Sequence, residues 1–131
     1  EFVGFDLTRT DVAEARDELP VDAAAGAYLG DVYGFAFSVL EELRAEAPPE
    51  LEPSLVALWP EHFDVAVELG RDDLGRRAAF GVSPGDATHP EPYVYVSPWS
   101  SPGFDELPWR DVLAAPDQRA AALSFLRARL P

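Results

Sequence analysis

Two histidines and several carboxylates in the second half of the chain are of the types that bind metals or transfer protons. His62 begins a strand-like segment, and Asp86, His89 and Glu91 follow another. Imidazole and carboxylate groups are ligands of divalent metals and also act as general acids and bases. One hypothesis is therefore a metal-dependent hydrolase-like enzyme that uses His62, Asp86, His89 and Glu91, with a divalent metal as its cofactor. The alternative is a structural network, because the Pro-Glu-His and His-Pro-Glu contexts are not recognised ligand spacings.

Other established chemistries have no signal in the sequence. The chain has no cysteine, which excludes disulfides and thiolate metal sites. It has no phosphate-binding loop, dinucleotide fingerprint or zinc-binding spacing. Ser83 also lacks the glycine-flanked elbow of a G-x-S-x-G nucleophile. Whether the protein is an enzyme is therefore left open by the sequence.

Aromatic residues near the same segments suggest a pocket for a sugar or an apolar ligand. The candidate ligand-binding residues are Trp59, His62, Tyr93, Tyr95 and Trp99. Ligand pockets are mostly apolar and aromatic, with a few polar groups that fix orientation. The alternative is that these aromatic residues anchor the core or the loops, which is their more common role.

Alternation of apolar and polar residues predicts the sheet that would position these groups. The expected strands cover about residues 55–59, 62–69, 76–83 and 93–98. Period-2 alternation is typical of half-buried strands, and consecutive strands joined by short polar loops favour an antiparallel meander. The loop of residues 83–86, Ser-Pro-Gly-Asp, suits a type II turn after the third of these segments.

The apolar pattern also predicts how residues 62–69 and 76–83 pair. With Leu69 opposite Arg76, the expected pairs are Phe63–Val82, Val65–Phe80 and Val67–Ala78, all on one face. On the other face Glu68 would meet Arg77 as an opposite-charge pair. This register brings His62, Ser83 and Tyr93 to the same end of the sheet.

Two helices are expected to pack on this sheet. Apolar residues recur every three or four positions over residues 22–47, where Asp22 is a suitable N-cap and two prolines follow. A C-terminal helix is expected over residues 116–130. In the long helix, Gly26, Gly30, Gly34 and Ser38 form a ridge of small residues. Such a ridge indicates either close packing on the sheet or another helix, or a groove for a ligand or partner.

Length and charge narrow the class of protein. The chain has 131 residues and a formal net charge of −14, and all ten basic residues are arginine. One α+β domain, residues 1–131, is the natural expectation, with either a short strand or an extended lead-in at residues 1–8 and a loop, with room for one helical turn, at residues 10–19. The negative charge disfavours nucleic acid and anionic membranes as partners, although it also fits an acidic nucleic-acid mimic. No segment is judged long enough to span a membrane, and a cytoplasmic location is expected.

Three motifs together resemble a known set of proteins. They are WPEHFD at 59–64, SPGD at 83–86 and PEPYVYVSPW at 90–99, preceded by a helix that ends in LEELRAEAP. The set resembles an uncharacterised family of bacterial proteins from GC-rich genomes, a domain of unknown function. The resemblance implies that this chain is the C-terminal portion of a longer protein. It also implies that the sheet lacks a partner strand, which a homodimer or the missing N-terminal segment would supply.

The favoured function is a ligand- or protein-binding module. The metal-dependent enzyme and the nucleic-acid mimic are the alternatives. The binding hypothesis predicts an aromatic-lined cleft, whereas the enzyme hypothesis predicts that His62, Asp86, His89 and Glu91 lie close together.

Overall fold

Residues 20–131 fold into a five-stranded antiparallel sheet with helices before and after it. The computed structural model describes residues 20–131, so the strand or extended lead-in expected at residues 1–8 and the loop expected at residues 10–19 lie outside the described residues. The elements are α2 (Ala23–Glu46), β1 (Ala57–Trp59), β2 (Asp64–Leu69), β3 (Ala78–Ser83), β4 (Tyr93–Pro98), β5 (Asp105–Pro108), α3 (Trp109–Ala114) and α4 (Gln118–Arg127). The strands pair in the order β1-β2-β3-β4-β5. The predicted α+β class and its antiparallel meander are confirmed.

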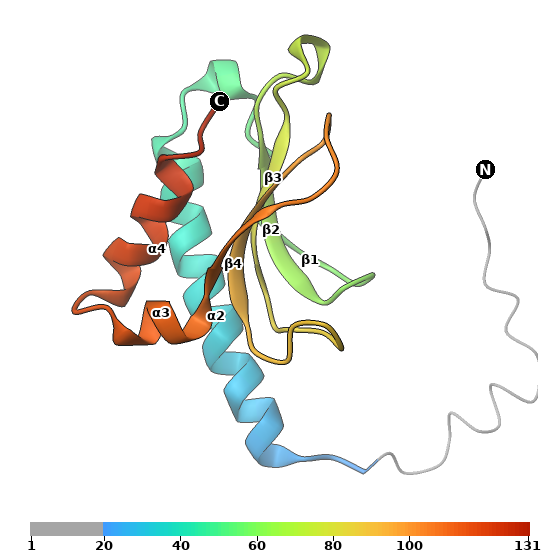
Figure 1. The fold of residues 1–131 in the computed structure, drawn as a ribbon, viewed down its shortest axis with the longest axis vertical. Coiled ribbons are helices and arrows are strands. Elements are labelled where there is room, and N and C mark those ends of the chain that lie inside the picture. Colours follow the sequence, from blue (N-terminus) through green and yellow to red (C-terminus); the bar gives the residue numbers. More distant parts are fainter. Residues whose placement is uncertain (1–19) are drawn as a thin grey trace, which may run out of the picture.

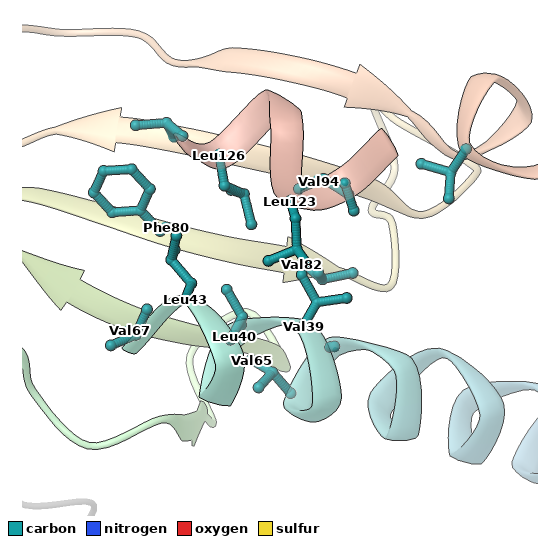
Figure 2. Packing of buried hydrophobic residues seen from close by; sticks show 14 of the residues in the cluster. Val39, Leu40, Leu43, Val65, Val67, Phe80, Val82, Val94, Leu123 and Leu126 are labelled. Carbon is teal, nitrogen blue, oxygen red and sulfur yellow. The ribbon is translucent and has the colours of Figure 1, made fainter. Parts of the chain in front are cut away.

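The helices lie on one side of the sheet and enclose the hydrophobic core. In Figure 1, α2, α3 and α4 are on the same side of β2, β3 and β4. Figure 2 shows side chains from the sheet and from two helices meeting in this layer; those labelled are Val39, Leu40, Leu43, Val65, Val67, Phe80, Val82, Val94, Leu123 and Leu126. Each such side chain contributes roughly 1.5–3 kcal/mol when fully buried. Hydrophobic burial therefore fixes which face of the sheet the helices cover.

The predicted pairing of β2 with β3 has the correct faces but the wrong register. Leu69 lies opposite Ala78, Val67 opposite Phe80 and Val65 opposite Val82, a shift of two residues from the prediction. A shift of two preserves the face of every side chain because the side-chain period of a strand is two. The extra length comes from the 3-10 turn Asp72–Leu74, which lengthens the loop between the strands.

The shift changes the partners of two residues singled out in the sequence. Glu68 lies opposite Ala79, yet Arg77 still reaches it diagonally, with 3.4 Å between Nη2 and Oε2. Phe63 was expected in the core opposite Val82, which is wrong: it precedes β2, is 62% exposed and has a φ of 55°. The hairpin therefore buries one apolar residue fewer than its pattern suggested.

The C-terminal part of the fold also departs from the prediction. Residues 99–109 were expected to be a loop, but residues 105–108 form the edge strand β5 on β4. Its sequence, Asp-Glu-Leu-Pro, has no β-branched residues or apolar alternation, so propensity gave no signal. The helix expected over residues 116–130 is shorter. A helical turn was also expected at residues 112–115, and α3 covers this region from Trp109, with Trp109 and Val112 buried.

Helix α2 begins and ends as the sequence predicts, within one residue. The Asp22 carboxylate accepts hydrogen bonds from the backbone N–H groups of Ala24 and Ala25, at 3.0 and 3.1 Å. Helix α2 is buried in the core through five residues, Val32, Ala36, Val39, Leu40 and Leu43. The helix is also long and apolar enough to span a membrane by length and composition alone, which the sequence analysis did not anticipate. Packing of these five residues in the core is an alternative reason for that composition.

Ion pairs attach α2 to α4 at the surface. Arg119 bonds to the Glu42 carboxylate and donates to the carbonyl oxygen of Ser38 at 3.0 Å. One turn after Glu42 on α2, Glu46 pairs with Arg127 of α4 at 2.6 Å. Opposite charges on the two helices therefore support the packing of their apolar faces.

The glycine ridge of α2 does not pack on the sheet or on another helix within residues 20–131. A Cβ atom placed on Gly26, Gly30 or Gly34 would have no heavy atom within 4 Å beyond its own helix. The expected close approach is therefore wrong for the described part of the chain. Among residues 20–131, Ser38 at the end of the ridge is the member that contacts another helix, through Arg119.

Replacing these glycines with alanine should stabilise the helix. Glycine in a helix interior costs roughly 0.5–1 kcal/mol relative to alanine, and the added methyl groups meet nothing. We expect Gly30→Ala and Gly34→Ala each to raise the free energy of unfolding by about this amount. Urea denaturation and amide hydrogen exchange in α2 measure the change. Ala27→Gly in the same helix is the reverse control, and lower stability in the alanine variants would contradict the prediction.

Candidate functional site

The face of the sheet opposite the helices carries a pocket. Its volume is about 610 Å³, and it is lined by residues from β2, β3 and β4 and from the loops around them: Glu61, His62, Phe63, Asp64, Ala79, Ser83, Asp86, Tyr93, Tyr95, Ser97 and Phe104. Strand alternation explains this set, because residues between the core-facing ones point to the other face. The pocket is therefore built on the strands whose opposite face is fixed by the core.

Asp64 and Tyr95 form the floor of this pocket. Asp64 is the first residue of β2 and is only 8% exposed. The Tyr95 hydroxyl on β4 donates a hydrogen bond to Asp64 Oδ2, although β3 lies between the two strands. The ring crosses β3 at Gly81, where an added Cβ would lie 2.6 Å from the Tyr95 ring. Glycine at position 81 is thus what allows a tyrosine on β4 to reach a carboxylate on β2.

Burial and the carboxylate keep the Tyr95 phenol protonated. Burial raises the pKa of Tyr95 far above its ordinary value near 10, and the hydrogen bond and negative charge of Asp64 raise it further. A pKa raised in the folded state stabilises the fold fully below about pH 10, and this stabilisation is lost as the pH rises toward the folded pKa. Tyr95 therefore acts as a neutral hydrogen-bond donor.

Alkaline titration provides a direct check on Tyr95. In the folded protein, Tyr95→Phe should leave the tyrosinate absorbance gained between about pH 9 and about pH 12 unchanged, because Tyr95 does not ionise there. In denaturant the same substitution should remove one tyrosine's contribution. A loss of amplitude in the folded protein would contradict the buried, carboxylate-bonded phenol.

Three aromatic rings form one wall of the pocket. Tyr93 and Phe104 are stacked, with centroids 5.6 Å apart and planes at 15°. Tyr95 meets Phe104 edge-on at 6.2 Å, and its centroid is 6.0 Å from that of Tyr93. Phe104 comes from the loop before β5 and remains 43% exposed. The wall thus depends on the strand that the sequence did not predict.

The loop after β3 places Asp86 at the rim. Its Oδ1 accepts the backbone N–H groups of Thr88 and His89 at 2.7 and 2.8 Å. These hydrogen bonds, His89 first, lower the pKa of Asp86 below its ordinary value. Gly85 has a φ of 100°, and an added Cβ would lie 2.7 Å from the carbonyl oxygen of His89. This loop therefore holds an ionised carboxylate at the pocket.

Some of the predicted ligand-binding residues line the pocket and others do not. His62, Tyr93 and Tyr95 line it, at the end of the sheet where they were expected. Trp59 and Trp99 are exposed by 40% and 52% and do not line it. The Trp99 ring instead lies under the Arg77 guanidinium, 5.3 Å from the centroid. Trp59 ends β1 and Trp99 directly follows β4. At such strand ends the alternation of the sequence does not predict which way a side chain points.

The four predicted metal ligands are divided between two hollows. His62 and Asp86 line the pocket, whereas His89 and Glu91 line a neighbouring hollow of about 290 Å³. His89 lies 3.6 Å from Asp86 Oδ1 and 3.1 Å from Glu106 Oε2. In residues 20–131 no group of three or more His, Cys, Asp or Glu side chains is arranged to hold a metal ion. The enzyme hypothesis thus gains no support from this geometry.

Comparison of the chain with protein-family models, curated proteins and solved structures gives no match. The function must therefore be argued from the site itself, and the resemblance stated above stays a prediction.

Asp64 and Phe104 were not among the residues chosen as ligand-binding or metal-binding, although Phe104 was counted among the aromatic residues near the sheet that could line a pocket, and Asp64 was noted as a carboxylate close to His62. Asp64 could have been found from alternation, because it lies between residues expected to face the core and so must face the opposite side. The aromatic type of Phe104 marked it as a possible pocket residue, but its Pro- and Gly-rich segment gave no signal for where it lies. Its position follows only from the pairing of β5 with β4.

Proposed function

We propose that this protein is a binding module whose ligand occupies the pocket on the open face of the sheet. The single observation that supports this most is the combination of a roughly 610 Å³ hollow with the nearly buried Asp64 at its floor. Small-molecule sites are typically concave, mostly apolar, and carry a few fixed polar groups. This pocket has those properties, and its volume is in the usual range of roughly 300–1,000 Å³.

Rigid support for the pocket also favours binding. Its lining residues on β2, β3 and β4 belong to strands whose other face carries Val65, Phe80 and Val94 in the core. Sites on strands are held more firmly than sites on loops alone. The polar groups at the floor are therefore preorganised, which reduces the entropy lost when a ligand binds.

A fragment screen followed by NMR tests the proposal. Small aromatic and aliphatic fragments are titrated into the isotope-labelled protein, and we expect binders to shift the amides of Gly81, Ser83 and Tyr95. Ala79→Phe adds a ring to a pocket-lining residue and should abolish these shifts. A second hollow, separate from the pocket, is lined by Ser101 and Arg77 near the C-terminus. The matched control is Ser101→Phe, which adds the same ring to this second hollow and should leave the shifts unchanged. Absence of binders, or binders that remain in Ala79→Phe, would contradict the proposal.

A further inference from the structure

The charge of the pocket is one-sided. Glu61, Asp64 and Asp86 contribute carboxylates to its lining, and no arginine among residues 20–131 lines it. By contrast, Arg76, Arg77 and Arg129 all line the other large hollow, near the C-terminus. The pocket therefore attracts cations and repels phosphates and carboxylates.

Asp64 is the group at which this charge is least compensated. Glu68, on the same face of the same strand, has Arg77 3.4 Å away. Asp64 is more buried than Glu68, yet within residues 20–131 no arginine or histidine nitrogen lies within ion-pair distance of it. Its hydrogen-bond donor is the neutral Tyr95 hydroxyl. A buried carboxylate is unfavourable unless it is paired, so a cation brought by a ligand would supply the missing charge.

The aromatic wall has the same preference. The rings of Tyr93, Tyr95 and Phe104 line the pocket together with the carboxylates, and an aromatic face that is open to the pocket attracts cations through its negative quadrupole. Phe63 at the rim is exposed and holds a φ of 55°, which few non-glycine residues adopt. Its backbone is fixed by a hydrogen bond of 2.7 Å from the Tyr33 hydroxyl to its carbonyl oxygen. A strained, exposed aromatic at a pocket rim is typical of a functional position.

We infer that the pocket binds a small organic cation, an ammonium or guanidinium group carried on an apolar body, with Asp64 as its counter-ion. This inference rests on the proposed function as a binding module. The volume of about 610 Å³ suits a small molecule, and the apolar body would lie against Tyr93 and Phe104 while the cationic group approaches Asp64.

Isosteric probe pairs test the inference. Benzyltrimethylammonium and benzamidine are each compared with neutral analogues, neopentylbenzene and benzamide, by NMR titration near neutral pH. We expect at least one cation to bind about tenfold more tightly than its neutral analogue, and the preference to weaken as salt is added. Asp64→Asn should remove the preference, whereas Glu68→Gln, on the same strand face, should keep it. Because Asp64→Asn alters a buried hydrogen bond, Phe104→Leu on the exposed wall is the second variant and should weaken cation binding several-fold while the melting temperature stays within a few degrees.

Each outcome distinguishes the inference from the proposed function. Neutral analogues that bind in the pocket as tightly as the cations would overturn the cation inference and leave the binding module standing. A cation preference that persists in Asp64→Asn would also overturn it. No binding of any probe or fragment in the pocket would overturn both. A capped arginine peptide that binds when the free cations do not would overturn the assignment to a small molecule.

Discussion

Gly70→Ala should destabilise the protein by more than about 3 kcal/mol, because the added Cβ cannot be accommodated without moving the backbone. Gly70 follows β2 with a φ of 103°, and a Cβ there would lie 2.0 Å from the carbonyl oxygen of Arg76. The Gly70 N–H also donates to the Leu51 carbonyl oxygen, which joins the loop to a second 3-10 turn, Pro49–Leu51, that follows α2. The measurement is the free energy of unfolding from urea titration, compared at unchanged slope.

Gly75 at the other end of the same loop is the matched control. It too has a positive φ, of 63°, but an added Cβ there would have no heavy atom within 4 Å. Gly75→Ala should therefore cost only the left-handed penalty, about 1–2 kcal/mol. Equal losses in the two variants would show that the close approach of Gly70 to Arg76 is not what shapes the loop between β2 and β3.

Phe80→Ala should lower the free energy of unfolding by about 3–5 kcal/mol, the range for aromatic truncation in a packed core. Phe80 is fully buried at the centre of the core layer, on the middle strand of the sheet. Its replacement removes apolar contacts and leaves a cavity between the sheet and the helices. Since domains are stable by only about 5–15 kcal/mol, this loss should be a large part of the total. Urea denaturation followed by circular dichroism measures it.

Phe37→Ala on α2 makes the same chemical change at the surface. Phe37 is 39% exposed, and alanine is the better helix former. The expected change is within about 1 kcal/mol. A loss at Phe37 as large as that at Phe80 would contradict the assignment of the core to the sheet-facing side of the helix.

The strand faces could be derived from the sequence, but the register could not. Alternation placed Val65, Val67, Phe80 and Val82 on one face, and the structure agrees. A shift by two residues leaves every side chain on the same face, so the apolar match alone could not distinguish the two registers. The prediction took the register with the shorter loop. The conformation of the 3-10 turn and the contact at Gly70 decided between the two registers, and neither is visible in a hydrophobic pattern.

The sequence by itself determined the α+β class, the long capped helix, the polar face of the sheet and the end of it where His62 and Tyr93 lie. These follow from local periodicity and capping, which involve residues close together in the chain. Only the tertiary structure decided that Tyr95 crosses β3 over Gly81 to reach Asp64, 31 positions away, and that Phe104 closes the wall. Such contacts depend on strand register and on the pairing of β5. The composition of the pocket is therefore a property of the folded sheet.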